Sequence, residues 1–327
     1  MMIAYDLEES RVREFIKNAG AKRVGVQLPA GLKAYWREIR GTVEECGAEA
    51  VLVGSSCYGA CDLADDLAIA AGCEALLHYG HSSMGLPSRL PVLYVEARVL
   101  LDPSPAVEEA LPSLKFRKVG LTTTVQHIGW LQKIRELLLS RGYEPYVGRP
   151  ERARYAGQVL GCDVESATSI SDQVEGFLHV GTGEFHPLAV AAVTQKEVLA
   201  VSPFGGSRTI SCEEFLRWRR GVIAKSLSCQ EFGILLSTKS GQWRPEVAKR
   251  VGEKLRGSGR KVCLIIQDEI RVEELEDYGF EAYVCTACPR LALDDARRVR
   301  FPILTPSEVD AMLGAGLKPD SLINLEG

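Results

Sequence analysis

Short runs of β-branched and other apolar residues alternate with amphipathic helical stretches along the whole chain. This alternation is typical of α/β proteins, in which helices cover parallel sheets. We expect three successive groups of four strands, at residues 23–27, 50–53, 75–79 and 92–95, then 118–122, 144–147, 177–180 and 198–201, then 232–236, 261–266, 282–285 and 302–304.

Parts of this pattern repeat residue by residue. Residues 22–26 (KRVGV) resemble residues 117–121 (RKVGL), and residues 77–81 (LHYGH) resemble residues 178–181 (LHVG). The first and third strands of each group are roughly 50 to 60 residues apart, which suits βαβ crossovers rather than hairpins. A chance similarity between α/β segments is the alternative. The repeat predicts three Rossmann-like lobes with parallel sheets arranged around a central site, with domains at 1–105, 106–222 and 223–327.

Polar and glycine-rich loops follow several of the expected strands. Ligands of such folds bind beyond the carboxyl ends of the strands. Three lobes that face inward would therefore enclose one site between loops of this kind, at residues 27–31, 80–83, 122–127 and 181–187.

Charge and hydropathy narrow the classes of function. The net charge is −4 and the pI is near 5.9, so no nucleic-acid partner that is held through its phosphates is expected. No apolar run approaches the roughly 18 residues of a membrane span, and the acidic N-terminal residues are unlike a signal peptide. We expect a soluble, cytoplasmic protein, not associated with a membrane, whose ten cysteines stay reduced.

Half of the cysteines are expected to pack as small apolar side chains, because they lie in turns, beside helices or within a strand. These are Cys46, Cys73, Cys212, Cys229 and Cys263. The run 217–220 (RWRR) is expected to be a solvated helix face, or alternatively a contact to a protein substrate.

The other five cysteines allow two kinds of metal site. A C-x3-C pair at Cys57 and Cys61 and a C-x2-C pair at Cys285 and Cys288 could form a four-thiolate zinc site. One loop cysteine from each repeat, Cys61, Cys162 and Cys288, could instead hold a 4Fe–4S cluster with one iron open to a substrate. In that case Cys285 is a residue of the strand interior. Spacing alone leaves both sites open.

Six motifs, in order along nearly the whole chain, resemble the diphthamide synthase family, whose archaeal members begin diphthamide formation on translation elongation factor 2. As a set they are far more specific than any one cysteine pair. They are residues 58–62 (YGACD), 80–82 (GHS), 122–127 (TTTVQH), 157–162 (GQVLGC), 185–188 (FHPL) and 287–290 (ACPR).

The resemblance implies that Cys61, Cys162 and Cys288 bind one 4Fe–4S cluster, with an electron donor as partner. It also implies a homodimer of three-lobed subunits. The reaction it implies is a transfer of the 3-amino-3-carboxypropyl group of S-adenosylmethionine to a histidine of elongation factor 2. Cleavage of the bond between sulfur and the γ-carbon releases methylthioadenosine.

Topology and the resemblance together suggest which side chains hold S-adenosylmethionine. Arg290 is expected to clamp a carboxylate, and four residues are expected to offer hydrogen bonds, namely Gln27, Ser82, Gln126 and Gly183.

The histidines fall into two groups. Three lie in the site-facing loops and are expected either to help catalysis by proton transfer or substrate orientation or to make structural bonds, namely His81, His127 and His186. His78 and His179 are expected to be hydrogen-bonded core residues, and by spacing none of the five looks like a metal ligand.

Two alternatives stay open. One is an enzyme like quinolinate synthase, in which the open iron acts as a Lewis acid and S-adenosylmethionine is not consumed. The other is a non-catalytic subunit that binds zinc or a partner. A nucleotide-binding Rossmann enzyme fits less well, because no GxGxxG follows the first expected strand.

Overall fold

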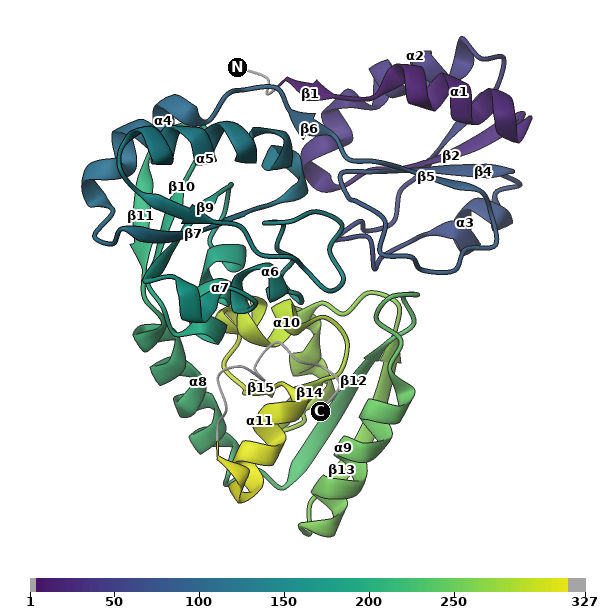
Figure 1. The fold of residues 1–327 in the computed structure, drawn as a ribbon. Helices are drawn as coiled ribbons and strands as arrows, with labels where there is room; N and C mark the ends of the chain where they lie inside the picture. The colour runs from purple at the N-terminus through teal and green to yellow at the C-terminus, as the bar shows by residue number, and fades with distance from the viewer. Residues whose placement is uncertain (1–3, 317–327) are drawn as a thin grey trace.

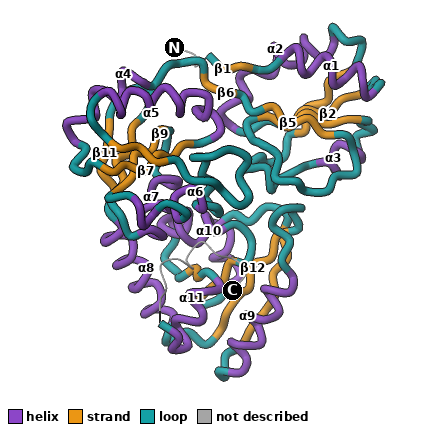
Figure 2. Tube along the Cα trace, viewed as in Figure 1, coloured by secondary structure: helices purple, strands orange, loops and turns teal. Residues whose placement is uncertain are grey.

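Three sheets, each built on four parallel strands, surround a centre that is occupied mainly by loops (Figures 1 and 2). The computed structural model describes residues 4–316. Each sheet belongs to one lobe, and the lobes lie at the corners of a triangle in Figure 1, with the first at upper right, the second at left and the third at the bottom. No helix among residues 4–316 is long and apolar enough to cross a membrane.

The first lobe holds a four-stranded parallel sheet in the order β3-β2-β4-β5. Its elements are β1 (Tyr5–Asp6), α1 (Glu9–Ala19), β2 (Arg23–Gln27), the 3-10 helix η1 (Ala30–Tyr35), α2 (Trp36–Glu44), β3 (Glu49–Val53), α3 (Asp65–Ala70), β4 (Ala75–Tyr79), β5 (Val92–Val95) and β6 (Arg98–Val99).

The second lobe repeats this strand order and adds one antiparallel strand at the edge, giving β11-β10-β9-β7-β8. Its elements are α4 (Ser104–Ala110), η2 (Leu111–Ser113), β7 (Lys118–Thr123), η3 (Val125–Trp130), α5 (Leu131–Ser140), β8 (Glu144–Tyr146), α6 (Glu165–Thr168), η4 (Ser171–Gln173), β9 (Gly176–Val180), α7 (Phe185–Thr194), β10 (Val198–Val201) and β11 (Ser207–Ile210).

The third lobe has the same order again, β13-β12-β14-β15, and all its strands are parallel. Its elements are α8 (Cys212–Ser226), β12 (Glu231–Ser237), α9 (Pro245–Gly257), β13 (Lys261–Gln267), η5 (Val272–Tyr278), β14 (Ala282–Cys285), α10 (Pro289–Leu293), η6 (Asp295–Arg298), β15 (Ile303–Leu304), α11 (Pro306–Asp310) and η7 (Ala311–Ala315).

One packing device recurs in all three sheets. The first strand of each lobe carries a glycine whose partner in the third strand is a bulky side chain, in the register pairs Gly25–Leu76, Gly120–Phe177 and Gly233–Tyr283. A Cβ on these glycines would lie 3.1, 2.4 and 2.7 Å from those side chains, respectively. The missing Cβ therefore makes room for the neighbour.

The strand orders of the three sheets confirm the expected α/β class with three repeated lobes.

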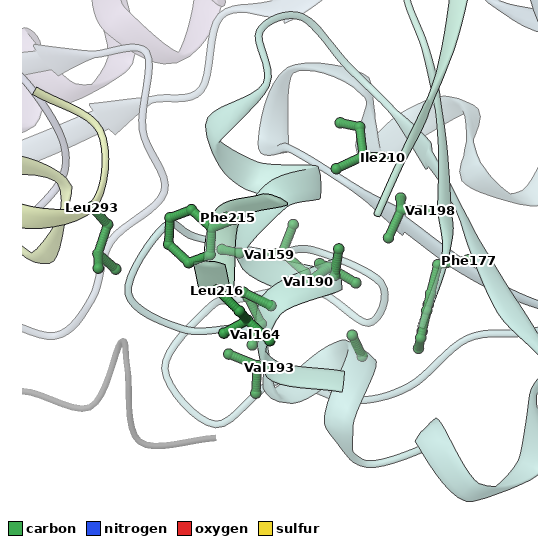
Figure 3. Packing of buried hydrophobic residues seen from close by; sticks show 14 of the residues in the cluster. Val159, Val164, Phe177, Val190, Val193, Val198, Ile210, Phe215, Leu216 and Leu293 are labelled. Carbon is green, nitrogen blue, oxygen red and sulfur yellow. The ribbon is translucent and has the colours of Figure 1, made fainter. Parts of the chain in front are cut away.

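The core of the second lobe also joins it to the third. Figure 3 shows Val190, Phe215 and Leu216 packed together, with Leu293 approaching from the third lobe. Phe215 lies on α8, which connects the two lobes, and Leu293 lies at the end of α10. Burial of these apolar side chains favours a fixed position of the third lobe against the second.

The structure corrects several expectations. β1, β6 and β11 were not predicted; each pairs antiparallel with its neighbour and lies outside the four-strand pattern that recurs in the three lobes. The limits of the predicted domains stay predictions, and residue 222 lies within α8.

Two side chains also differ from expectation. Cys263 is exposed because β13 is an edge strand. Arg219, in the run expected to be solvated, is fully buried and donates to both carboxylate oxygens of Glu308 at 2.7 and 2.5 Å.

Candidate functional site

One cysteine from each lobe lines a single cavity of about 350 Å³. Cys61 lies in the loop after β3, Cys162 in the loop after β8, and Cys288 immediately before α10. Sequence reasoning selected this trio, and the structure brings its members together. The cavity, which we call the three-cysteine cavity, is lined by Cys61, Met84, Leu86, Glu151, Arg152, Cys162, Gly241, Gln242, Arg244, Ala287, Cys288 and Pro289.

Burial and mutual repulsion oppose ionisation of these thiols. Burial raises the pKa of Cys162 to about 11, and the negative charge of a Cys61 thiolate adds to this shift. The pKa of Cys288 is raised well above its ordinary value, first by burial and then by Cys61 and Cys162. Three thiolates can coexist here only around a positive centre, so this donor set fits a thiolate-bound metal centre.

A loop of the third lobe closes the cavity over Cys61. The backbone N–H of Gly241 donates to the Cys61 carbonyl at 2.9 Å, and a Cβ on Gly241 would lie 2.5 Å from the Cα of Cys61. The amide of Gln242 lies 3.5 Å from the Cys61 Sγ, and this hydrogen bond lowers the pKa of the thiol while burial raises it more. Arg244 lines the cavity and donates to the Ala287 carbonyl at 2.9 Å.

A buried ion pair anchors this loop to the first lobe. The ammonium of Lys239 lies 2.5 Å from a carboxylate oxygen of Asp62 and donates to the Ser56 hydroxyl at 2.7 Å. Both charged side chains are almost completely buried. Asp62 also accepts the backbone N–H of Tyr58 at 3.2 Å. The pair therefore fixes the loop that carries Cys61 at the junction of two lobes.

Sequence reasoning missed this third-lobe loop. Residues 239–244 (KSGQWR) form a polar, glycine-containing loop soon after the first strand of their lobe, as residues 27–31 do in the first lobe. Equivalence of position between repeats was the signal that could have found Gln242 and Arg244.

The five residues expected to hold S-adenosylmethionine lie outside the lining of the three-cysteine cavity. Gln27 is fully buried. Its amide nitrogen donates to the Asp62 carbonyl and its amide oxygen lies 2.8 Å from His78 Nδ1. Ser82 accepts from the Gln158 amide at 3.0 Å, and Gln126 donates to the Gly80 carbonyl at 2.6 Å, so both join the first lobe to the second.

The other two predicted contacts lie near the surface. Gly183 is exposed in the loop before α7, with φ of +80°. Arg290 pairs with Asp294 at 3.2 Å and lies over the ring of Phe185, with 5.6 Å between guanidinium carbon and ring centroid. These five contacts to S-adenosylmethionine stay predictions.

The histidines in the described part of the chain gather where the first and second lobes meet. His78 and His81 lie 2.9 Å apart, between Nε2 and Nδ1, and the rings of His179 and His186 stack with centroids 6.3 Å apart. Burial lowers the pKa of His81, His127 and His186 to about 4. At neutral pH these imidazoles are therefore uncharged.

His78 and His179 are hydrogen-bonded core residues, as expected. Both are fully buried, and their Nδ1 atoms lie 2.8 Å from the Gln27 Oε1 and 3.1 Å from the Thr122 hydroxyl, respectively. The interior position expected for Cys285 is confirmed too, because its side chain is fully buried in β14.

Together, the fold and the cavity define an α/β protein of three repeated lobes that directs one cysteine from each lobe into a shared site. The model of the diphthamide synthesis protein family matches residues 28–321. The chain belongs to this family.

Curated relatives and solved structures agree with this assignment. The chain is 41% identical to 2-(3-amino-3-carboxypropyl)histidine synthase of Pyrococcus horikoshii over 95% of this chain and 91% of that protein. It is 31% identical to subunit 1 of the corresponding synthase of Eremothecium gossypii over 95% of this chain and 75% of that protein. The crystal structure of Dph2 from Pyrococcus horikoshii with a 4Fe-4S cluster superimposes with a TM-score of 0.89 at 40% identity, covering 96% of this chain and 92% of that one.

Proposed function

We propose that this chain is a 2-(3-amino-3-carboxypropyl)histidine synthase that catalyses the first step of diphthamide biosynthesis. The reaction transfers the 3-amino-3-carboxypropyl group of S-adenosylmethionine to an imidazole carbon of a histidine and releases methylthioadenosine. The observation that carries the proposal is the convergence of Cys61, Cys162 and Cys288 on one cavity in a chain of this family.

In this proposal the three cysteines hold a 4Fe–4S cluster. When bound, the cluster supplies the electron that splits a carbon–sulfur bond of S-adenosylmethionine. Three thiols are one fewer than the irons of such a cluster, so one iron would be free to bind a substrate, and the three side chains that would hold the cluster line a cavity of about 350 Å³.

The residues around the cavity have roles that follow from their contacts. The Gln242 amide, 3.5 Å from the Cys61 Sγ, stabilises a thiolate by donating to it. Arg152 and Arg244 bring positive charge to the cavity wall, which offsets the thiolates and attracts the substrate carboxylate. Gly241 lets the backbone lie against Cys61, which excludes water from that side.

Proton transfer is assigned to the neutral histidines. Substitution at an imidazole carbon removes a proton from the acceptor histidine, so a base is needed near the site. His81, His127 and His186 are unprotonated at neutral pH, since their pKa values are about 4. The proposal keeps these three as candidates for that base, and keeps Arg290 as a carboxylate contact.

The finer parts of the proposal concern partners and location. We assign translation elongation factor 2 as the protein substrate, a homodimer as the assembly, an electron donor as a further partner, and the cytoplasm as the location. Their support is the family to which the chain belongs.

The test is a reaction with S-adenosylmethionine and elongation factor 2, carried out with reduced protein in the absence of oxygen. Methylthioadenosine together with a mass gain on the factor is the expected result. Deoxyadenosine would contradict the proposed bond cleavage. An intact cluster without consumption of S-adenosylmethionine would favour chemistry like that of quinolinate synthase, and zinc in place of iron would favour a non-catalytic subunit.

A further inference from the structure

Beside the three-cysteine cavity, three metal-binding side chains of the first lobe meet in the interior. The Sγ of Cys57 lies 3.9 Å from the Nε2 of His78 and 3.9 Å from the Nδ1 of His81, and the two nitrogens are 2.9 Å apart. No other group of three such side chains among residues 4–316 is arranged closely enough to hold one ion. Cys57 and His78 are buried, and His81 is partly so.

We propose that Cys57, His78 and His81 form a second metal site, which binds one divalent d-block cation, Zn²⁺ being the best match. A tetrahedral zinc ion with bonds of about 2.3 Å to sulfur and about 2.0 Å to nitrogen separates S from N by about 3.5 Å and N from N by about 3.3 Å. The observed separations differ from these values by about 0.4 Å each, within the reach of small side-chain rotations.

The hydrogen bonds around Gln27 fix His78 in the form that binds a metal. The Gln27 amide nitrogen donates to the carbonyls of Ser56 and Asp62 at 3.0 and 2.7 Å, so its oxygen must be the acceptor. That oxygen accepts from the Ala64 backbone at 3.1 Å and from His78 Nδ1 at 2.8 Å. His78 therefore carries its proton on Nδ1 and presents the Nε2 lone pair to Cys57 and His81, as metal-binding histidines do.

The other two ligands can adjust when a cation binds. Without a cation, the Nδ1 of His81 must donate to His78 Nε2, because that atom is an acceptor. Binding moves the proton of neutral His81 from Nδ1 to Nε2 and removes the thiol proton of Cys57. The balanced step forms one metal–sulfur and two metal–nitrogen bonds and releases one proton to solvent. A metal-bound His81 has no free lone pair, so the role of catalytic base then falls to His127 or His186.

The second lobe serves as an internal control for this site. His179 occupies the position of His78, and the Thr122 hydroxyl lies 3.1 Å from its Nδ1. Thr182 stands in the place of His81, and the Nε2 of His179 has no hydrogen-bond partner among the described residues. The shared histidine is thus a feature of the repeat, and the added cysteine and second histidine belong to the first lobe alone.

The experiment measures metal content rather than enzyme activity. Protein purified without oxygen is incubated with Zn²⁺, desalted, and analysed for zinc and iron by mass spectrometry. Binding of Co²⁺ in place of zinc is followed through the thiolate-to-cobalt absorption band. The variants are Cys57→Ser and His81→Gln, with Cys229→Ser and His179→Gln as matched controls for a buried cysteine and a buried histidine.

We expect one zinc ion per wild-type chain beyond the iron, retained in both control variants and lost in Cys57→Ser and His81→Gln while the iron content is unchanged. Absence of zinc and of the cobalt band from the wild-type protein would overturn the proposal. So would zinc that persists in Cys57→Ser, or iron that is lost there, since iron loss would assign Cys57 to the cluster. Iron content in the wild-type protein tests the three-cysteine site separately, so failure of one proposal does not imply failure of the other.

Discussion

The first and second lobes carry the same histidine at the same point of the same strand, yet surround it differently. His78 and His179 both pair in register with a polar residue of the first strand, Gln27 and Thr122 respectively. On the other ring nitrogen His78 meets His81 and Cys57, whereas His179 meets no hydrogen-bond partner among residues 4–316. The strands thus preserve a scaffold, and the loops that follow them decide its chemistry.

The third lobe extends this comparison. Its residue at the same strand position is Cys285, which pairs in register with Leu235. Both side chains are buried and apolar, so this position carries no polar pair in the third lobe. What all three lobes keep is one loop cysteine at the shared cavity. The three lobes therefore share one strand order and each contributes one cysteine to the central cavity, but the residues around that cavity differ from lobe to lobe.

The largest expected effect tests whether the three lobes contribute equally through their cavity cysteines. Cys61→Ala, Cys162→Ala and Cys288→Ala should each lower methylthioadenosine formation by at least about 100-fold, because a lost ligand perturbs a metal centre more than a lost neighbour does. The measurement is product formation together with iron content, and the exposed Cys263→Ser serves as the control. Normal activity of any one alanine variant would show that the lobes do not contribute equally.

The next effect concerns the contact between the first and third lobes. Lys239→Met leaves the Asp62 carboxylate buried without its partner and should lower the free energy of unfolding by about 3–5 kcal/mol. Denaturant unfolding measures the loss. The double variant Lys239→Met/Asp62→Leu should recover much of it, and a loss as large as in the single variant would show that the ion pair is not the cause.

The next prediction concerns how a buried histidine makes the free energy of unfolding depend on pH. Burial lowers the pKa of His127 from 6.5 to about 4, so the unfolded chain binds a proton before the folded one as the pH falls. The contribution of this residue to the free energy of unfolding is therefore fully present above about pH 6.5. It falls by on the order of 3 kcal/mol as the pH is lowered to about 4.

The variant His127→Gln should therefore show a flatter decline of unfolding free energy between pH 6.5 and pH 4 than the wild-type chain. Stability measured by denaturant at a series of pH values checks this. An unchanged slope would mean that His127 is protonated equally in both states.

The smallest effect uses the glycine that recurs in each first strand. Gly120→Ala places a Cβ 2.4 Å from Phe177, whereas Gly25→Ala places one 3.1 Å from Leu76. The first should cost about 1–3 kcal/mol by overpacking and the second less. Thermal unfolding of the two variants measures the difference, and a larger loss for Gly25→Ala would contradict the packing argument.

The sequence predicted the features that depend on local pattern. The four parallel strands of each lobe were predicted because apolar runs of suitable length recur with turn residues between them. The choice of Cys61, Cys162 and Cys288 depended on the repeat and on the family motifs, and the three side chains do share one cavity.

What the sequence could not give depends on contacts between distant residues. The partners of Lys239 and Arg219 are 177 and 89 residues away, and no local pattern marks either pair. The buried hydrogen bonds of Gln27 likewise join it to residues 35 and 51 positions away, which no local pattern marks. The approach of Cys57 to two histidines escaped prediction for the same reason, since their spacing along the chain is unlike that of a local metal motif.

The order of the three cavity cysteines along the chain has a consequence for biogenesis. As the ribosome releases the chain, Cys61 and Cys162 emerge with their lobes well before Cys288, and the loop that covers Cys61 belongs to the last lobe. A nascent chain with two folded lobes would offer only two of the three thiols. Delivery of iron and sulfide is therefore expected to be a late maturation event, coupled to the docking of the third lobe.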